Sequence, residues 1–182
     1  MAHKARTPSR LFLKVTLGLI DENAIAMSND FQVAMGRAVG GEIAYSGRLG
    51  RHVSLGTGMG LRSLSYIDLS RQKRGTVLFD WTLSLHIIFP IRVGGRDWFE
   101  IYINGAAGLA MAKLRVLDLG VGFVAQGTAG LQINFARSFG LFFDVGYRYT
   151  GLWFGDSENY PNYEGKKLWG QLAVNAGLVF TF

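Results

Sequence analysis

The feature that most constrains this sequence is an alternation of apolar and polar side chains along nearly its whole length. In residues 76–91, one parity carries large apolar residues such as Trp81, and the other carries polar residues such as Asp80 and His86. A period of two is that of a β-strand, whose successive side chains point to opposite faces. Helical spacing fits none of the alternating segments, so the chain is predicted to be all-β. There are eight of them, at residues 11–19, 37–49, 53–66, 76–91, 99–111, 121–135, 139–153 and 167–182.

The lengths of these segments and of their connections favour a membrane barrel. Strands of soluble sheets usually have about 5–6 residues, whereas about 9–11 residues cross a bilayer obliquely. Three connections are tight and rich in Gly or Arg, "RLGRH", "PIRVGGRD" and "ARSFG". The other four are polar and mostly longer: "DENAIAMSND", "DLSRQKRG", "LDLG" and "GDSENYPNYEGKK". Bacterial outer-membrane barrels have short periplasmic turns and longer outer loops, so both termini are expected on the periplasmic side.

The side chains on the two faces of the segments differ in size. This difference distinguishes a soluble barrel from a membrane barrel. A soluble lipid-binding barrel points its apolar face inward around a ligand. Here the apolar face carries nearly all the large side chains, and an eight-stranded interior is just filled by side chains. The rings of Phe79, Trp81, Phe143 and their neighbours could not all fit inside, but they can face lipid. The sequence therefore predicts an eight-stranded antiparallel up-and-down transmembrane β-barrel.

The first residues allow two interpretations. We expect residues 1–9 to be a basic leader or a tag-like segment, and residues 10–182 to be a single barrel domain. The stretch "LFLKVTLGLI" followed by "AIA" at 24–26 could instead be a signal peptide. However, Lys14 interrupts the apolar run, and removing 26 residues would leave seven strands, whereas single-chain bacterial barrels use even numbers. The segment is therefore expected to be structural, with the export signal missing from this sequence.

Composition excludes some classes of function. The chain has no Cys, so it can form neither a disulfide nor a thiolate metal site. The net charge of +6 could suggest nucleic acid, but the basic residues lie mostly in the first ten positions and in predicted turns. No nucleic-acid partner, metal site or cofactor is expected.

Charged residues on the inward parity are the main candidates for a functional site. Because buried charges must be paired, they are predicted to form a salt-bridge network that plugs the lumen. The alternative is a polar path, a narrow conduit for protons or small solutes. Arg62 and Asp80 are expected at similar heights, with Glu42 between Lys14 and Arg62. The predicted set is Lys14, Glu42, Arg62, Asp80, Glu100, Asp144 and Arg148.

An enzyme that modifies lipid A is a further alternative. Such barrels need nucleophile and base groups that reach the lipid, such as His with Ser and a carboxylate. His3 lies in the leader, His52 at a predicted periplasmic turn and His86 on the inward face. No such set appears on the apolar face, so a non-enzymatic protein is expected.

Aromatic residues near the segment ends predict two girdles at the membrane boundaries. They are Phe89, Phe99, Phe135 and Phe139 at the turn end, and Tyr149 and Trp153 at the loop end. Lys113 and Arg115 share the outward parity, and they are placed above the bilayer or after a bulge because a midplane charge is costly.

The segments "VGGEIAYSGRLGRHVSLGTGMGLRS" and "LFFDVGYRYTGLWF" and the terminal "GLVFTF" resemble the small outer-membrane β-barrel superfamily that includes the OmpA transmembrane domain and OmpX. The resemblance implies that Phe182, with Phe180 and Leu178, is the signal read by the barrel-assembly machinery. It also implies a monomeric barrel in contact with the lipid bilayer and lipopolysaccharide. It is specific for architecture but not for activity. The expected role is therefore envelope structure or surface interaction through the loops, and the loops are modest beside those of adhesin-like members.

Overall fold

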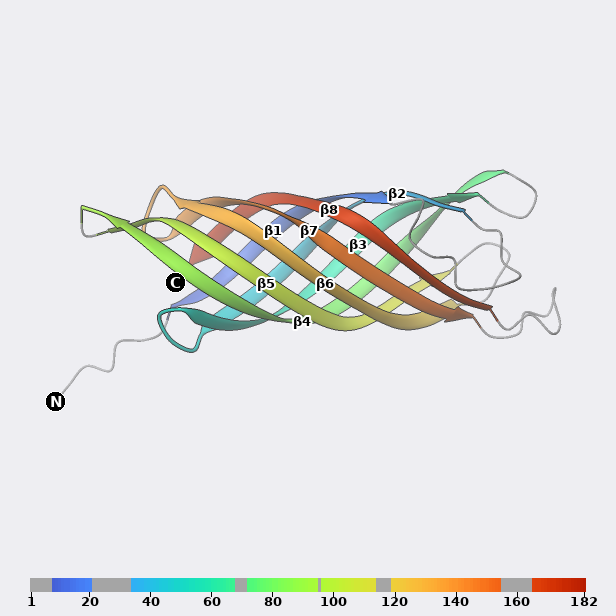
Figure 1. The fold of residues 1–182 in the computed structure, drawn as a ribbon, viewed down its shortest axis with the longest axis horizontal. Coiled ribbons are helices and arrows are strands. Elements are labelled where there is room, and N and C mark those ends of the chain that lie inside the picture. Colours follow the sequence, from blue (N-terminus) through green and yellow to red (C-terminus); the bar gives the residue numbers. More distant parts are fainter. Residues whose placement is uncertain (1–7, 21–33, 68–71, 95, 114–118, 155–164) are drawn as a thin grey trace.

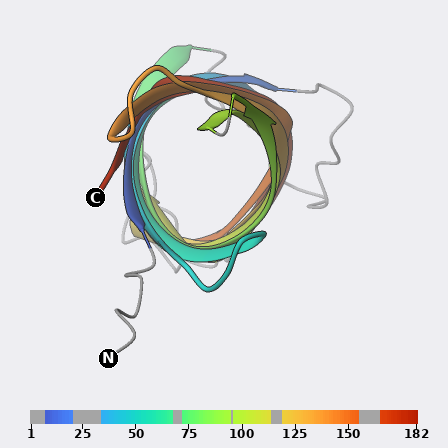
Figure 2. The ribbon, with the colours of Figure 1, turned by 90° about the vertical axis from the view of Figure 1, so that its left-hand side faces the viewer.

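The computed structural model describes residues 8–20, 34–67, 72–94, 96–113, 119–154 and 165–182, which form a closed barrel of antiparallel strands (Figures 1 and 2). The eight strands are β1 (Ser9–Ile20), β2 (Ala34–Arg48), β3 (Val53–Ile67), β4 (Lys73–Val93), β5 (Arg96–Lys113), β6 (Leu119–Asn134), β7 (Phe139–Phe154) and β8 (Gly165–Thr181). Each strand pairs with its neighbours in chain order. The eight-stranded up-and-down barrel predicted from the sequence is confirmed.

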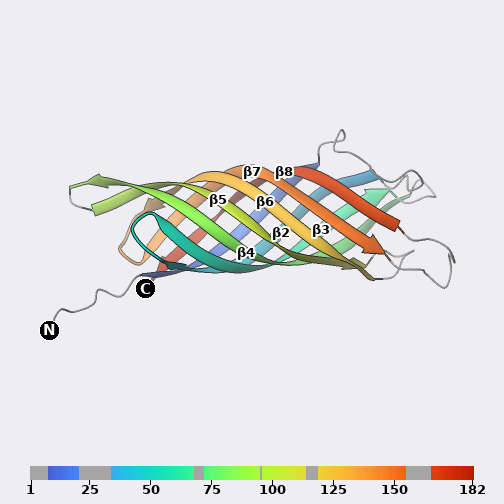
Figure 3. The same ribbon diagram turned by 60° about the horizontal axis from the view of Figure 1, so that its bottom comes forward.

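Closure between the first and last strands leaves no open edge. Residues Arg10 to Ile20 of β1 pair with Thr181 to Gln171 of β8. The final residue takes part as well, because the N–H of Ser9 donates to the carbonyl of Phe182 (3.1 Å) and the N–H of Phe182 donates to that of Ser9 (3.0 Å). Every backbone group in lipid must be satisfied internally, and closure satisfies those of the edge strands. We call the end that holds Ser9 and Phe182 the turn end, and the opposite end the loop end (Figure 3).

Some strands extend farther than the sequence pattern predicted. The stretch "PIRVGGRD" was expected to be a turn, but β4 continues to Val93 and β5 begins at Arg96. The turn itself is confined to the neighbourhood of Gly94, whose φ is +60°, a conformation that suits glycine. β4 also begins at Lys73 and β8 at Gly165, inside the predicted loops. These predictions were wrong because backbone pairing does not require apolar side chains where a strand continues beyond the apolar band.

The domain prediction concerns residues that are only partly described. β1 begins at Ser9, one residue before the predicted start of the barrel domain at residue 10. Residues 1–7 of the predicted leader lie outside the described residues, as does Arg115. Among the described residues, no helix is long and apolar enough to cross a membrane.

Side chains alternate between an exposed apolar exterior and a buried interior. Met59 and Leu83 on the outward face are 59% and 57% exposed. Arg62 and Asp80 on the inward face are 1% and 0% exposed. A soluble barrel would show the reverse arrangement, because exposed apolar surface of this extent is unfavourable in water. The exterior is therefore suited to lipid.

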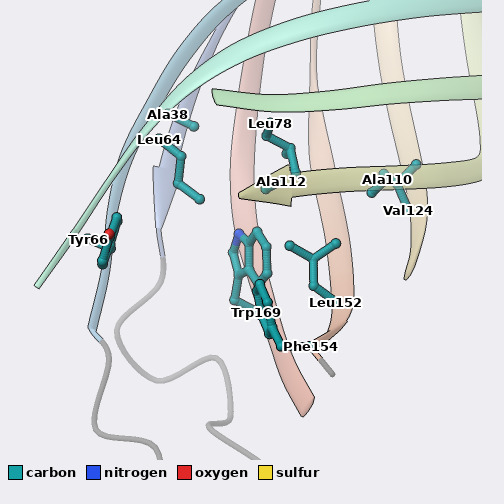
Figure 4. Packing of buried hydrophobic residues seen from close by; sticks show 10 residues of the cluster. All are labelled: Ala38, Leu64, Tyr66, Leu78, Ala110, Ala112, Val124, Leu152, Phe154 and Trp169. Carbon is teal, nitrogen blue, oxygen red and sulfur yellow. The ribbon is translucent and has the colours of Figure 1, made fainter. Parts of the chain in front are cut away.

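The lumen is not uniformly polar, because apolar side chains also lie on the inward face beside the predicted charged set. An apolar cluster near the loop end contains Leu64, Leu78, Leu152, Phe154 and Trp169 among its members (Figure 4). A second cluster nearer the turn end consists of Phe12, Ile88, Tyr102, Phe142 and Val179, all buried. These residues share the inward parity of the charged positions. They fill the narrow interior above and below the charges, so the lumen consists of alternating polar and apolar layers.

Candidate functional site: the charged interior of the barrel

The middle of the lumen contains a continuous chain of charged side chains. Lys14 lies directly opposite Glu42 in the β1–β2 register, and its Nζ donates to Glu42 Oε1 at 2.9 Å. The other carboxylate oxygen, Oε2, accepts from Nη2 of Arg62 on β3 at 3.0 Å. One buried carboxylate therefore joins cations from two neighbouring strands, as the strand heights predicted from the sequence would require.

The chain continues across the lumen through Asp80 on β4. Arg62 Nη1 donates to Asp80 Oδ2, and Arg148 Nη2 on β7 forms an ion pair with the same oxygen at 2.8 Å. Arg148 Nη1 then donates to Gln126 Oε1 on β6 at 3.0 Å. Asp80 thus lies between two guanidinium groups from opposite parts of the wall. We call these six residues, Lys14, Glu42, Arg62, Asp80, Arg148 and Gln126, the lumen network.

A separate ionic cluster surrounds Glu100 near the turn end. Arg10 donates to both carboxylate oxygens of Glu100, at 2.6 and 2.7 Å, and Arg48 Nη2 donates to Oε1 at 2.7 Å. Arg10 lies on β1, Arg48 on β2 and Glu100 on β5, so the contacts cross the lumen. Such bidentate, charge-assisted bonds are among the stronger polar contacts in proteins. Sequence reasoning missed both arginines, because it assigned Arg48 to the turn "RLGRH" and began the first alternating segment at Leu11, one residue after Arg10. Their even numbers, which match Lys14 and Glu42, were the available signal.

Asp144 belongs to neither ionic group, although it was included in the predicted set. Its carboxylate accepts from Tyr102 Oη at 2.8 Å and from the amide of Asn175. Within the described part of the chain it forms no salt bridge. Hydrogen bonds from neutral donors therefore satisfy this carboxylate, while the other six predicted residues take part in ion pairs.

A small cavity lies inside the described part of the lumen. A cavity of about 20 Å³ lies between the turn-end apolar cluster and the lumen network, bordered by Phe12, Lys14, Glu42, His86 and Asp144 among others. A volume of roughly 10–15 Å³ on this measure accommodates one water molecule. The cavity therefore has room for about one or two waters and is not an open channel.

Neither described histidine is arranged for nucleophilic catalysis. The ring of His86 stacks on Tyr102 and meets Phe12 edge-on, with centroids 6.1 and 5.8 Å apart. His52 Nδ1 is 2.9 Å from the carbonyl oxygen of Ile88 and donates to it. In the ranges that the structure describes, neither ring bonds a serine or a carboxylate. Those same ranges contain no group of three or more His, Asp or Glu that could hold a metal ion. His3 lies outside them.

Aromatic rings gather near both ends of the outer wall. At the turn end, Phe139 lies between Phe135 and Phe180, with centroids 6.5 and 5.6 Å apart, and Phe89 and Phe99 are exposed. At the loop end, Trp153 contacts Phe123 at 5.6 Å, and Tyr149 contacts Tyr147 at 4.9 Å. At the C-terminus, Phe182 is 70% exposed while Leu178 and Phe180 are partly buried. These rings lie near the strand ends, and their assignment to girdles at the membrane boundaries stays a prediction.

Comparison with solved structures identifies the architecture. OprG of Pseudomonas aeruginosa superposes with a TM-score of 0.69 at 10% identity, over 97% of this chain and 96% of that one. The chain has the fold of the small eight-stranded outer-membrane β-barrels. AlkL, determined in lipid bilayers, gives a TM-score of 0.65 at 13% identity over 100% of this chain and 93% of its own. OmpW of Escherichia coli gives 0.57 at 11% identity over the whole of both chains. No protein-family model and no protein of curated function matches the sequence.

Proposed function

We propose that this protein is a non-enzymatic integral protein of the bacterial outer membrane whose lumen is plugged by charge. Its role is to contribute to envelope structure or to surface interaction through its loops. The exposed apolar exterior and the fold shared with outer-membrane barrels support the location. The turn end faces the periplasm and the loop end faces outward, as in barrels with short periplasmic turns.

The observation that carries the closed-lumen proposal is the position of Asp80. Its carboxylate joins Arg62 on β3 to Arg148 on β7, so the lumen network reaches from one side of the wall to the other. Apolar layers lie toward both ends of it. A hydrated ion would have to displace paired charges and packed rings to pass. This arrangement favours the plug over the narrow conduit.

Other parts of the proposal follow from the outer wall. Phe89, Phe99, Phe135 and Phe139 form the periplasmic girdle, and Tyr149 and Trp153 form the outer one. Phe182, with Phe180 and Leu178, is the segment that the barrel-assembly machinery reads. The protein functions as a monomer in contact with the bilayer and lipopolysaccharide. The histidine environments support a non-enzymatic role over lipid-A modification.

Conductance tests the plug. The purified protein in planar lipid bilayers should give no resolvable current steps. Replacing Arg148 by serine removes the guanidinium that crosses the lumen, and brief steps should then appear. R137S, at an exposed arginine in the β6–β7 turn, is the matched control and should remain silent. Steady steps from the unmodified protein would contradict the plug and favour the conduit.

A further inference from the structure

The outer wall has a concave apolar region across β8, β1, β2, β3 and β4. This groove has a volume of about 900 Å³, and its border includes Val15, Ile43, Met59, Leu61 and Trp81. Gly41 lies within it, opposite Val15 on one side and Leu61 on the other. Because Gly41 has no side chain, the outer surface of the barrel is recessed at this residue relative to its neighbours. We call this region the outer groove.

Above the outer groove, the same strands change from apolar to basic and hydroxyl side chains. Along β3, Met59 and Leu61 are followed toward the loop end by Ser63 and Ser65. Along β2, Gly41 is followed by Val39 and Arg37. Arg37 is four residues from Gly41, a distance of about 13 Å at the usual strand rise. The outer groove therefore leads along its own strands to polar groups at the membrane boundary.

Three exposed cations lie at this boundary. Arg37 on β2, Lys73 on β4 and Lys113 on β5 all have the outward parity, and we call them the basic margin. The hydroxyl of Ser65 donates to the carbonyl of Arg37 at 3.3 Å, which ties the arginine to the next strand. Between Arg37 and Lys113 lies Gly75, where an added Cβ would meet no atom within 4 Å. The three strand spacings between the two cations correspond to about 15 Å, with an open site between them.

Acidic residues do not neutralise the basic margin on the described wall. The chain has 13 acidic residues, of which eight belong to segments 21–33, 68–71, 114–118 and 155–164. Of the remaining five, Glu42, Asp80, Glu100 and Asp144 lie in the lumen. Asp97 pairs with Arg92 at the turn end. The charged residues on the outward face of the described strands at the loop end are therefore all cations.

The margin is also restricted to one side of the barrel. On β6 and β7, the outward residues nearest the loop end are Leu119 and Trp153, both exposed and apolar. Cations thus occur on the strands that form or adjoin the outer groove. An amphiphile with an anionic head and apolar chains would meet complementary chemistry on this side.

We propose that this face binds one phosphate-bearing lipid of the outward leaflet. Its phosphate lies on the basic margin near Gly75 and the serine hydroxyls, and its acyl chains lie in the outer groove. Arginine and lysine are the usual partners of phosphate oxygens. The inference rests on the proposed function, because it requires the wall to be in a membrane with its loop end outward.

Binding to lipid A in neutral detergent, measured by native mass spectrometry, tests the inference. The probes are diphosphoryl lipid A, the same lipid without phosphates, and the diphosphorylated disaccharide without acyl chains. The diphosphoryl lipid should bind most tightly. The variant R37Q/K113Q should weaken it roughly 25-fold, because each basic side chain at a membrane surface contributes roughly a factor of five. R51Q/R137Q, which removes two exposed arginines at the turn end, is the matched control and should bind as the unmodified protein does.

The variant G41L tests the outer groove separately. A Cβ at residue 41 would meet only the carbonyl oxygen of Lys14, at 3.6 Å, which is an ordinary contact, so the fold should tolerate it. The leucine should occupy space in the groove that the acyl chains need. Because adding atoms to a filled site is unfavourable, lipid binding should weaken roughly fivefold or more. Binding of the disaccharide should not change.

Several results would overturn the inference. One is an equal affinity of R37Q/K113Q and the unmodified protein for diphosphoryl lipid A. The others are binding of the dephosphorylated lipid, or of the disaccharide, as tight as that of diphosphoryl lipid A. An unchanged affinity in G41L would also overturn it, because the acyl chains would then lie elsewhere. A compact, heat-sensitive band on an unheated gel verifies the barrel in every sample. If the compact band were absent from the unmodified protein, the proposed function would be overturned as well. If the band were present but lipid binding failed, only the lipid-binding inference would be overturned.

Discussion

Replacing Asp80 by asparagine should lower the free energy of unfolding by about 3–5 kcal/mol, the usual cost of removing one partner from a buried ion pair. The substitution preserves shape but removes the negative charge between Arg62 and Arg148, each with a side chain only 1% exposed. Two guanidinium groups would then face each other with only Glu42 to balance them. Urea unfolding in lipid vesicles, followed by tryptophan fluorescence, measures the loss.

Two further variants make this prediction specific. D97N changes a carboxylate whose partner, Arg92, is 58% exposed, and it should cost less than about 1 kcal/mol. The double variant D80N/R148Q removes one of the two facing cations and should recover part of the stability lost in D80N. A loss in D80N no larger than that in D97N would mean that the network does not stabilise the barrel.

Replacing Gly108 by alanine should lower the free energy of unfolding by a similar amount, for a steric reason. Gly108 lies opposite Thr82 in the β4–β5 pair, and a Cβ there would overlap the carbonyl oxygen of Trp81. Backbone cannot move aside as a side chain can, so the two strands would have to separate. We expect a loss of about 3 kcal/mol, at the upper end of what overpacking costs, together with a lower yield of folded barrel.

Gly105, on the same strand but facing outward, provides the matched control. A Cβ added at residue 105 would meet nothing within 4 Å. G105A should therefore change stability by less than about 1 kcal/mol, because removing a strand glycine is close to neutral or slightly favourable where there is space. The gel shift of the unheated sample and urea unfolding compare the two variants. Equal stability of G108A and G105A would contradict the close strand approach described at Gly108.

The parts of the fold that depend on the alternation of inward and outward side chains could be predicted from the sequence. The alternation around Trp81 and Asp80 specifies which side chains face outward, because a one-residue slip would exchange the two faces. Strand number and the order of short and long connections then determine the barrel. Lys14, Glu42, Arg62 and Asp80 were predicted to be neighbours because they occupy similar heights on adjacent strands, and the register brings them together.

Contacts that cross the lumen could not be predicted in this way. Arg10 and Glu100 are 90 residues apart and lie on strands that do not pair, so no register rule relates them. Asp144 could be assigned to the interior, but its choice of Tyr102 and Asn175 over a cation depends on side-chain lengths in three dimensions. The loop-end apolar layer was missed because residues such as Leu152 and Phe154 lie at the end of a strand, where the alternation between apolar and polar residues breaks down.

The most direct test of the central claim is the environment of outward residues along β4. Since the chain has no cysteine, single cysteines at Val77, Phe79, Leu83, Leu85 and Ile87 can each carry a fluorophore without background labelling. In vesicles containing lipids brominated near the middle of the bilayer, quenching should occur at all five positions, should be strongest in the middle of the strand, and should be weakest toward its two ends. A cysteine at Thr82, which is buried in the lumen, should resist labelling. Absence of quenching at the five outward positions, with ready labelling at residue 82, would contradict a membrane-spanning barrel.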